Sequence, residues 1–354
     1  MVIEYKRGNL LEDEADALVN TVNCVGVMGK GIALQFKQAF PQNFLEYQKA
    51  CRKGEMQPGK MFIHYTGNLF KHKYIINFPT KRHWRGKALV KDIELGLHEL
   101  VKEVKRLGIK SIAIPPLGCG NGGLDWEVVK PKIEAAFVQL PEVRVRLYVP
   151  AGSPDNEAMK FNTKRPRMTR ARALFIALME KYAVPGYRIS LLEIQKLAYF
   201  LQAVGEPLRL NFIKGKYGPY AENLNFVLQN LDGHYIRGYG DRSRNAQIRL
   251  LPKAYQEAEE FLQAEPESRK RLEDVEKIIF GFETPYGLEL LSTVHWVANE
   301  NQGKYTDLQT IFLSIQEWNE RKRELFKYEH VQKAWEHLKN FDVLFDRKTD
   351  NCEL

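Results

Sequence analysis

Several features that define special classes of protein are scarce or absent in this sequence. No apolar run approaches the ~18 residues of a membrane-spanning helix. The first residues, MVIEYKRGNL, carry charge from Glu4 onward, so we expect no secretory signal. The four cysteines lie far apart without CxxC spacing, which argues against a disulfide framework and against a zinc site. We therefore expect a reduced, cytoplasmic protein with no membrane contact and no bound metal or cofactor.

What is present is the composition of a folded protein with large cores. The chain has 354 residues, of which 44% are hydrophobic and 27% are charged. At about 150 residues per domain, this length predicts two domains. Residues 1–150 hold 23 Lys and Arg against 15 Asp and Glu, whereas the remainder holds 30 against 29. This asymmetry suggests that only the first half faces a polyanion.

The first half alternates short apolar runs with helical patterns, which predicts an α/β fold. Runs with the length and β-rich content of strands are Val2–Tyr5, Ala17–Asn20, Met61–Tyr65, Tyr74–Phe78, Ser111–Pro115 and Val143–Val149. Apolar residues at three- and four-residue spacing predict helices over Gly31–Phe40, Asn43–Arg52, Val90–Leu107 and Trp126–Gln139. Such alternation predicts a three-layer α/β/α sandwich. Its sheet is expected to be mixed, because some connections are too short for a crossover helix.

The second half is predicted to be mostly α-helical. Residues 153–170 contain Pro, Asn and clustered charge with little apolar periodicity, so they are predicted to be a linker. Helical periodicity then covers Ala171–Tyr182, Ser190–Val204, Ala221–Leu231, Pro252–Ala264, Ser268–Gly281, Pro285–Asn299, Thr306–Trp318 and Val331–Leu338. This organisation predicts a first domain over residues 1–152 and a helical domain over residues 171–354.

Two glycine-rich loops follow predicted strands in the first half. The first runs from Val19 to Ala33 and the second from Pro115 to Trp126, and each passes from a strand end through a loop to the start of a predicted helix. Glycine lets the backbone approach a ligand closely, and a helix N-terminus presents unpaired N–H groups, so two such loops could clamp a diphosphate. Glycines after strands can also be simple turn residues. Asn20 and Asn23 can hydrogen-bond sugar hydroxyls, but they could equally be cap and turn residues.

These ordered motifs resemble the macrodomain, the ADP-ribose-binding fold. They are Arg7-Gly8-Asn9-Leu10, the run from Val19 to Ala33, Asn77-Phe78-Pro79-Thr80-Lys81 and Gly118-Cys119-Gly120. Within the superfamily, the chain is most similar to the DNA-directed branch of antitoxins that oppose a DNA-modifying toxin. The resemblance implies that both loops hold the diphosphate and that Asn20 and Asn23 lie near the distal ribose. The ADP-ribose contacts implied in this way are Asn9, Leu10, Asn20, Thr21, Asn23, Gly26, Val27, Met28, Gly29, Gly31, Ile32, Thr80, Gly118, Cys119, Gly120, Asn121, Gly122, Gly123 and Leu124.

A basic segment, residues 81–87, follows the strand predicted over Tyr74–Phe78. Its cations can neutralise phosphates and its tryptophan can stack on an unpaired base, although a solvated surface loop is the alternative. The candidates for contact with single-stranded DNA are Arg82, Trp84, Arg85 and Lys87. The resemblance implies that Lys81 is catalytic. A partly desolvated lysine would attack the anomeric carbon, whereas a protonated lysine would assist departure of the base.

One position departs from the pattern of a related human hydrolase that removes acyl-linked ADP-ribose. That relative carries an Asp in its second glycine loop, which works with the lysine, whereas the aligned residue here is Gly122. Asp125 is expected to cap the next helix. His83 is the nearest group that titrates around neutrality and is the candidate for proton transfer. Cys119 is expected to pack beneath the loop and not to act as a nucleophile.

The helical half shows no recognisable catalytic constellation. Its segments Leu192–Gln202 and Phe212–Tyr220 are similar to the Panacea, SocA-like domain, the toxin-neutralising part of several toxin–antitoxin systems. This resemblance implies a cognate DarT-like ADP-ribosyltransferase toxin as partner, although most of these residues could simply build a helical core. Candidates for the interface, by residue type alone, are Tyr217, Tyr220, Trp296 and Trp318.

The sequence and its resemblances together predict an antitoxin that acts in two ways. The first domain would hydrolyse the N-glycosidic bond between ADP-ribose and thymine in single-stranded DNA, and the second would sequester the toxin. A hydrolase of acyl-linked ADP-ribose is a rival that gives no reason for the positive charge or for Trp84. A non-catalytic ADP-ribose reader leaves Lys81 unused, and a nucleic-acid scaffold leaves both glycine loops unexplained.

Overall fold

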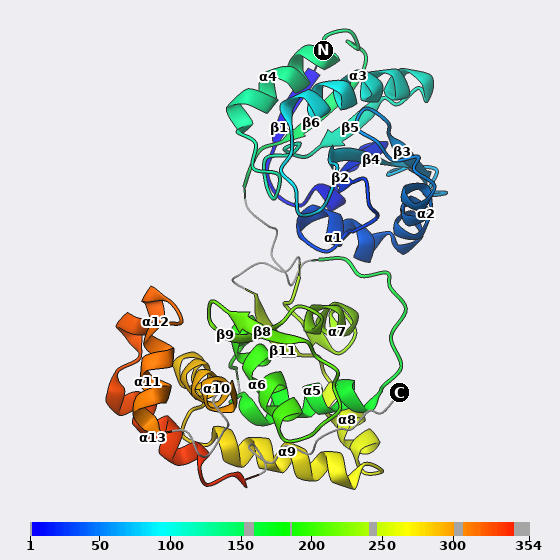
Figure 1. Ribbon diagram of the computed structural model, residues 1–354. Coiled ribbons are helices and arrows are strands. Elements are labelled where there is room, and N and C mark those ends of the chain that lie inside the picture. Colours follow the sequence, from blue (N-terminus) through cyan, green and yellow to red (C-terminus); the bar gives the residue numbers. More distant parts are fainter. Residues whose placement is uncertain (1, 152–158, 185, 241–245, 301–306, 343–354) are drawn as a thin grey trace. The chain divides into compact units, whose positions relative to one another are not determined.

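The structure is a computed structural model that describes residues 2–151, 159–184, 186–240, 246–300 and 307–342 (Figure 1). The chain divides into two compact units. The first unit is made mainly of residues up to Lys164, and the second unit mainly of residues from Arg165 onward. Each unit is described by itself.

The first unit is built on a six-stranded sheet in the order β1-β6-β5-β2-β4-β3. Its neighbouring strands are parallel except for the antiparallel pair β3 and β4, so the sheet is mixed, as predicted. The strands are β1 (Val2–Lys6), β2 (Ala17–Asn23), β3 (Phe62–Tyr65), β4 (Tyr74–Lys81), β5 (Ser111–Ile114) and β6 (Arg144–Tyr148). The helices are the short η1 (Leu10–Glu12), α1 (Gly31–Ala39), α2 (Pro41–Arg52), α3 (Val90–Arg106) and α4 (Trp126–Phe137).

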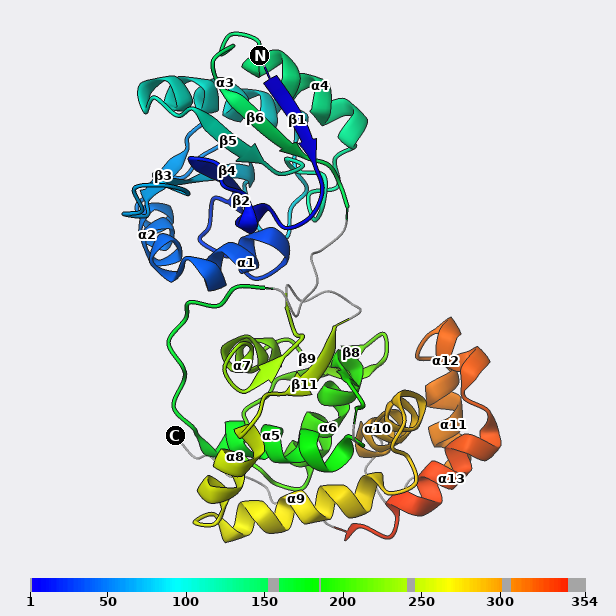
Figure 2. The same cartoon turned by 180° about the vertical axis from the view of Figure 1, so that it is seen from behind.

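Apolar side chains that alternate between the two faces of the central strands allow helices to pack on both sides of the sheet, which gives three layers. Val19 of β2 and Ile76 of β4 are buried in the core that the sheet shares with α3 and α4. Their neighbours Leu18 and Ile75 point to the opposite face, into the core shared with α1. Figures 1 and 2 show α1 and α2 on one face of the sheet and α3 and α4 on the other. Parallel strands that are covered on both faces are typical of such folds, and the predicted α/β/α sandwich is confirmed.

The second unit is mostly helical, as predicted. Its helices are α5 (Arg170–Tyr182), α6 (Leu191–Ala203), α7 (Leu224–Leu231), α8 (Ala254–Leu262), α9 (Pro266–Ile279), α10 (Pro285–Glu300), α11 (Leu308–Gln316), α12 (Glu320–Leu325) and α13 (Tyr328–Leu338). Its short strands are β7 (Ile189–Ser190), the hairpin β8 (Phe212–Gly215) and β9 (Gly218–Ala221), β10 (Ile236–Arg237) and β11 (Gln247–Leu250). The short helix α12 and the strands β7, β10 and β11 were not predicted. None of the helices in the described ranges is long and apolar enough to cross a membrane.

Helix α6 shows how the sequence fixes the core of the second unit. It begins at a capping box, in which Ser190 Oγ accepts the backbone N–H of Glu193 at 3.3 Å and the Glu193 carboxylate accepts the N–H of Ser190 at 2.7 Å. Nine consecutive residues of this helix, Glu193 to Leu201, are buried. A helix that is buried on all sides belongs to the centre of a domain.

The predicted linker is only partly visible, since residues 153–158 lie outside the described residues. Asn162 is anchored in the first unit, where its backbone N–H donates to the Gln38 carbonyl at 2.9 Å and its Nδ2 donates to the Ala39 carbonyl at 2.7 Å. Arg165 is anchored in the second unit by an ion pair with Glu257 at 2.7 Å. The chain therefore passes from one unit to the other at residues 164–165.

Candidate functional site

The glycine loops emerge at one edge of the sheet of the first unit. Strand β2 lies between β5 and β4 and is parallel to both, so the carboxyl ends of the three strands meet. The first loop, residues 24–30, connects β2 to α1, and the second loop, residues 115–125, connects β5 to α4. Strand β4 ends at Lys81. Ligands of open α/β sheets bind outside the carboxyl ends of the strands.

The two loops and Lys81 meet around Asn121. An ideal Cβ atom on Gly31, the first residue of α1, would lie 2.9 Å from Asn121 Nδ2, so the end of the first loop touches the second. Gly31 also has a φ of +60°, which favours glycine. The ammonium of Lys81 donates a hydrogen bond to the carbonyl oxygen of Asn121. The structure thus brings a lysine, a helix N-terminus and both glycine loops into one place.

Positive charge surrounds the point where Lys81 and the two glycine loops meet. The pKa of the Lys81 amine is lowered, mainly by burial and further by the positive charge of Lys30. Lys30 is exposed at the N-cap of α1, and no acidic residue lies in the first turn of that helix. Neither lysine forms an ion pair with a residue that the structure describes. Two lysines beside the free N–H groups of a helix N-terminus suit an anion such as a diphosphate.

Asn23 gives the first loop its shape. Its side-chain Oδ1 accepts the backbone N–H groups of Val25 at 3.0 Å and Val27 at 3.3 Å, and its Nδ2 donates to the Val27 carbonyl at 2.6 Å. The Tyr47 hydroxyl donates to the Asn23 carbonyl oxygen at 2.5 Å. These bonds hold the side chain in the turn, so in this structure Asn23 has the role of a turn residue.

Asn20, in contrast, has a buried acceptor that no described residue satisfies. Its Nδ2 donates to Asn77 Oδ1 at 2.9 Å, and Asn77 Nδ2 donates in turn to Asn43 Oδ1 at 2.7 Å. All three side chains are fully buried. Asn20 Oδ1 has no hydrogen-bond partner within the described structure. Because buried polar atoms are normally paired, this oxygen is an acceptor with an unused hydrogen bond.

The second loop is held by close backbone packing. The N–H of Leu124 donates to the Gly118 carbonyl at 3.0 Å, and an ideal Cβ atom on Gly122 would lie only 2.2 Å from that carbonyl oxygen. A side chain is therefore excluded at the position where the human relative carries its Asp. Asp125 caps α4, since its Oδ1 accepts the N–H of Glu127 at 3.0 Å. Burial raises the pKa of the Cys119 thiol to about 11, which disfavours the nucleophilic thiolate.

Residues 82–87 of the basic segment are exposed, and an ion pair also holds Arg82 to the protein. Arg82 forms two hydrogen bonds to the buried carboxylate of Asp92, at 3.1 and 3.2 Å, so its guanidinium is engaged within the protein. Trp84 is 44% exposed, the Arg85 guanidinium lies 4.5 Å from its ring centroid, and the His83 ring lies 5.6 Å away. His83 Nδ1 accepts the N–H of Arg85 at 3.3 Å. None of the hydrogen bonds of the described residues joins His83 to Lys81, and proton transfer by His83 stays a prediction.

The other predicted contacts are distributed around this centre. Asn9 caps η1 by accepting the Leu11 N–H at 3.1 Å, and Leu10 is buried; both follow β1, at the edge of the sheet. The remaining positions lie in the two loops, near the ends of β2 and β4, at the start of α1 or in the basic segment: Thr21, Gly26, Val27, Met28, Gly29, Ile32, Thr80, Gly120, Gly123 and the exposed Lys87. Sequence reasoning missed Asn43, because one asparagine in an amphipathic helix gives no sign that it faces β4. Across the described ranges, no group of three or more His, Cys, Asp or Glu residues could hold a metal ion.

In the second unit, the four aromatic candidates differ in exposure. Tyr217 is 43% exposed on the turn between β8 and β9. Tyr220, Trp296 and Trp318 are partly buried. The Trp318 Nε1 donates to the Gly215 carbonyl at 2.9 Å, and the Trp296 ring packs 6.1 Å from that of Tyr199. Tyr217 is therefore the candidate best placed to contact a partner.

Known proteins resemble this chain either over its first unit or over nearly its whole length. The family model described as "Macro domain" matches residues 19–133. The "DNA ADP-ribosyl glycohydrolase" of Thermus aquaticus is 47% identical over 338 residues, which cover 95% of this chain and 93% of that protein. A "DNA ADP-ribosyl transferase-DNA ADP-ribosyl glycohydrolase fusion protein" of Thermosipho africanus is 37% identical over 158 residues, covering 40% of each chain. The solved macrodomain of Mycobacterium tuberculosis DarG is 54% identical, covering 42% of this chain and 99% of that one, with a TM-score of 0.42.

Proposed function

The chain belongs to the DNA ADP-ribosyl glycohydrolase (DarG) family, and on this premise we propose that it removes ADP-ribose from thymine bases of single-stranded DNA. The observation that carries the proposal is the position of Lys81, whose amine is held against Asn121 where the two glycine loops meet. ADP-ribose would place its diphosphate near that lysine and its distal ribose against the adjoining strand ends. The first unit is thus the enzyme, a hydrolase of the N-glycosidic bond. The cytoplasmic location of the protein remains a prediction.

The loops and their neighbours supply contacts of the required types. The N-terminal N–H groups of α1 and the Lys30 ammonium are donors for diphosphate oxygens. The unpaired Asn20 Oδ1 is an acceptor for a ribose hydroxyl. Gly122 lets the second loop pack closely against Gly118 and Ala88, which holds the loop in its shape. The other residues named from the family resemblance remain proposed ADP-ribose contacts.

The reaction replaces the bond between the anomeric carbon and the thymine nitrogen with a bond to the oxygen of water. The electron pair of the broken bond leaves with the base, which then takes up a proton. Lys81 can act as the free amine that attacks the anomeric carbon and expels the base; water then cleaves the bond between that carbon and Lys81 Nζ, which releases ADP-ribose and regenerates the amine. Alternatively, Lys81 can act as the ammonium that stabilises the charge on the departing base while water attacks the carbon. The lowered pKa of Lys81 increases the fraction of free amine near neutrality and so favours the first role.

Contact with DNA is assigned to the exposed part of the basic segment. The Trp84 ring is a stacking surface for an unpaired base, and Arg85 and Lys87 are cations for the neighbouring phosphates. Arg82 forms an ion pair with Asp92 that fixes the segment to α3, and its side chain is still 69% exposed, so it remains a proposed DNA contact as well.

The second unit is proposed to neutralise the cognate ADP-ribosyltransferase toxin by binding it. The name of the Thermosipho africanus protein, which joins a DNA ADP-ribosyl transferase and a glycohydrolase in one chain, supports such a pairing. The full chain carrying Lys81→Ala should still co-purify with the toxin and relieve its toxicity. Loss of both properties in this variant would remove direct binding from the proposal.

The catalytic proposal is tested with a single-stranded oligonucleotide that carries ADP-ribose on thymine. Wild-type protein should release ADP-ribose, followed by mass, and Lys81→Ala should release none while still binding ADP-ribose in a titration. Undiminished release by Lys81→Ala would remove Lys81 from the mechanism. Binding without release by the wild type would indicate a reader, and release only from modified Glu or Asp would indicate the acyl-linked substrate.

A further inference from the structure

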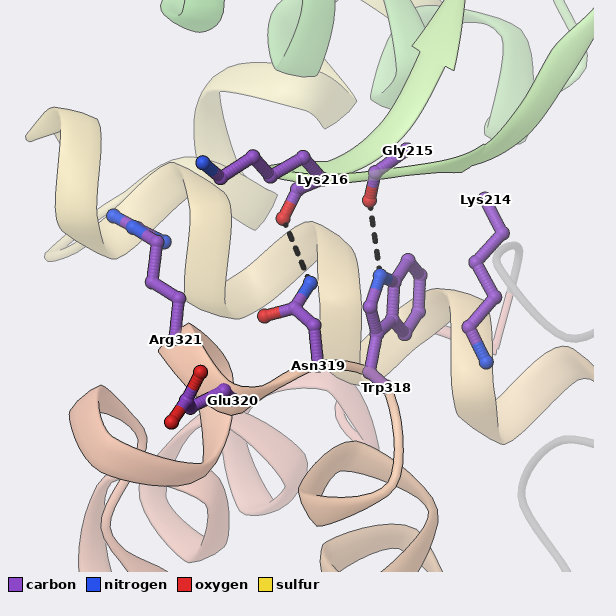
Figure 3. A pocket seen from close by; sticks show the side chains of 7 residues that line it. All are labelled: Lys214, Gly215, Lys216, Trp318, Asn319, Glu320 and Arg321. Carbon is purple, nitrogen blue, oxygen red and sulfur yellow. Dashed lines mark hydrogen bonds between the residues drawn. The ribbon is translucent and has the colours of Figure 1, made fainter.

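The second unit contains a pocket of about 610 Å³ that has no part in the proposed hydrolysis. It lies between the β8–β9 hairpin and the segment that joins α11 to α12 (Figure 3). One wall carries Lys214, Gly215 and Lys216, and the other carries Trp318, Asn319 and Arg321. Its volume is larger than a single small anion requires, so it can take up part of a chain.

The two walls are joined by hydrogen bonds, so the pocket is preformed. Trp318 Nε1 donates to the Gly215 carbonyl at 2.9 Å, and Asn319 Nδ2 donates to the Lys216 carbonyl at 3.1 Å (Figure 3). The base of the hairpin is fixed to the core, because the buried Lys196 donates to the Pro219 carbonyl at 2.6 Å. A ligand would therefore meet a rigid surface, which lowers the entropic cost of binding.

Positive charge exceeds negative charge in and below this pocket. Lys214 and Lys216 are exposed, and neither forms an ion pair with a described residue. Arg321 shares the buried Glu289 carboxylate with Lys322, so two cations are paired with a single acid. Glu320 contributes one carboxylate to the lining. The pocket therefore suits a polyanion.

An exposed aromatic ring beside the pocket distinguishes between two kinds of polyanion. Tyr217 is 43% exposed, with Arg321 4.8 Å and Lys216 5.5 Å from its ring centroid. The basic segment of the first unit has the same arrangement, in which Arg85 lies over the 44% exposed ring of Trp84. An acidic peptide would use the cations but not the open ring. Cations combined with an exposed aromatic ring are typical of surfaces that bind single-stranded nucleic acid.

We propose that this pocket and Tyr217 form a second contact site for single-stranded nucleic acid. Two phosphates bind to Lys214 and Lys216, and one base stacks on Tyr217. Arg321, held by Glu289, supports the ring from the protein side. The inference deepens the proposed function, because it assigns the substrate strand a contact outside the first unit, but binding itself needs no ADP-ribose.

The test uses the full chain and an unmodified, fluorescently labelled oligothymidine of about 16 nucleotides. Binding is measured by anisotropy between about 50 and 200 mM salt, where each lost phosphate contact reduces the slope of log affinity against log salt by about 0.7. The double variant Lys214→Gln/Lys216→Gln should therefore have a slope shallower by about 1.4. The control Lys270→Gln/Lys333→Gln, which removes the same charge from exposed positions on α9 and α13, should keep the wild-type slope.

The stacking contact is tested separately at Tyr217. Tyr217→Phe should bind like the wild type, and Tyr217→Leu should bind about fivefold or more weakly. An unchanged slope in the Lys214/Lys216 variant, or an equal change in the control, would overturn the proposal. Equal displacement of the strand by an oligoglutamate peptide would assign the pocket to acidic protein segments instead. Because the probe carries no ADP-ribose, failure of this test and failure of the hydrolysis proposal are distinguishable.

Discussion

Replacing Gly122 with alanine tests whether close backbone packing holds the second loop in its shape. The added Cβ atom would lie 2.2 Å from the Gly118 carbonyl oxygen and 2.9 Å from Ala88 Cβ, so the loop must open. Opening also disturbs the hydrogen bond from the Ala88 N–H to the Gly122 carbonyl, at 3.0 Å. Overpacking costs about 1–3 kcal/mol, and a lost hydrogen bond costs about 0.5–1.5 kcal/mol. The free energy of unfolding of the first unit should fall by about 2–4 kcal/mol.

The chain offers a matched control in the same loop. Gly120 has open space where its Cβ atom would lie, so Gly120→Ala should change the unfolding free energy by less than about 0.5 kcal/mol. Unfolding is followed in urea, and the transition of the first unit is the one that ADP-ribose moves to higher denaturant. Gly122→Ala should also bind ADP-ribose more weakly in a titration. The reasoning is refuted if both variants unfold at the same urea concentration and Gly122→Ala binds ADP-ribose as tightly as the wild type.

Three further predictions concern charge and buried polar groups. Lys30→Gln should raise the pKa of Lys81 and so move one limb of the pH–rate profile to higher pH. The acid limb should move if the free amine reacts, and the alkaline limb should move if the ammonium reacts. An unmoved profile would contradict the influence of Lys30 on this pKa. Asn77→Ala removes the acceptor of the Asn20 amide, so urea unfolding should show a loss of about 1–3 kcal/mol, and wild-type stability would disprove the network's role. Burial lowers the pKa of Lys196 from 10.5 to about 7. Between these pH values the unfolded chain binds more protons than the folded chain, so the free energy of unfolding should rise with pH. Lys196→Met should remove this rise in unfolding experiments across that range.

Hydrophobic periodicity predicted the architecture because the residues that form each helix or strand are neighbours in the sequence. The apolar alternation in β2 and the three- and four-residue spacing in α3 are both readable from a short window. The two-residue strands β7 and β10 were missed because such short segments carry no periodicity. Strand β4 extends to Lys81, beyond its predicted end at Phe78, since pairing with β2 continues to Asn23. Tertiary pairing therefore placed Lys81 at the end of a strand.

Side-chain roles that depend on a partner far away in the sequence could not be predicted from the sequence. The cluster of cations in residues 81–87 predicted a basic surface, but only the structure shows that Asp92 of α3 engages Arg82. Asn20 and Asn23 have the same side chain, three residues apart. Neighbours from other elements leave an unpaired acceptor on Asn20 and hold Asn23 in the turn. The residue type predicts which hydrogen bonds or charges a side chain can offer. Its neighbours in the folded structure determine whether those groups are already engaged within the protein.

The chemistry open to Lys81 depends on the groups that surround its amine. Gly122 has no room for a side chain, and Asp125 is engaged in capping α4. Within the described structure, the Lys81 amine is held by the carbonyl of Asn121 and influenced by the charge of Lys30, and neither lysine is paired with a carboxylate. A lysine with an ordinary pKa would be almost wholly protonated near neutrality and could not attack carbon or accept a proton. Burial and the charge of Lys30 lower the pKa of the Lys81 amine, so the fraction of free amine at a given pH is larger than for a lysine in water. Whether that amine takes part in the hydrolysis is what the Lys81→Ala variant tests.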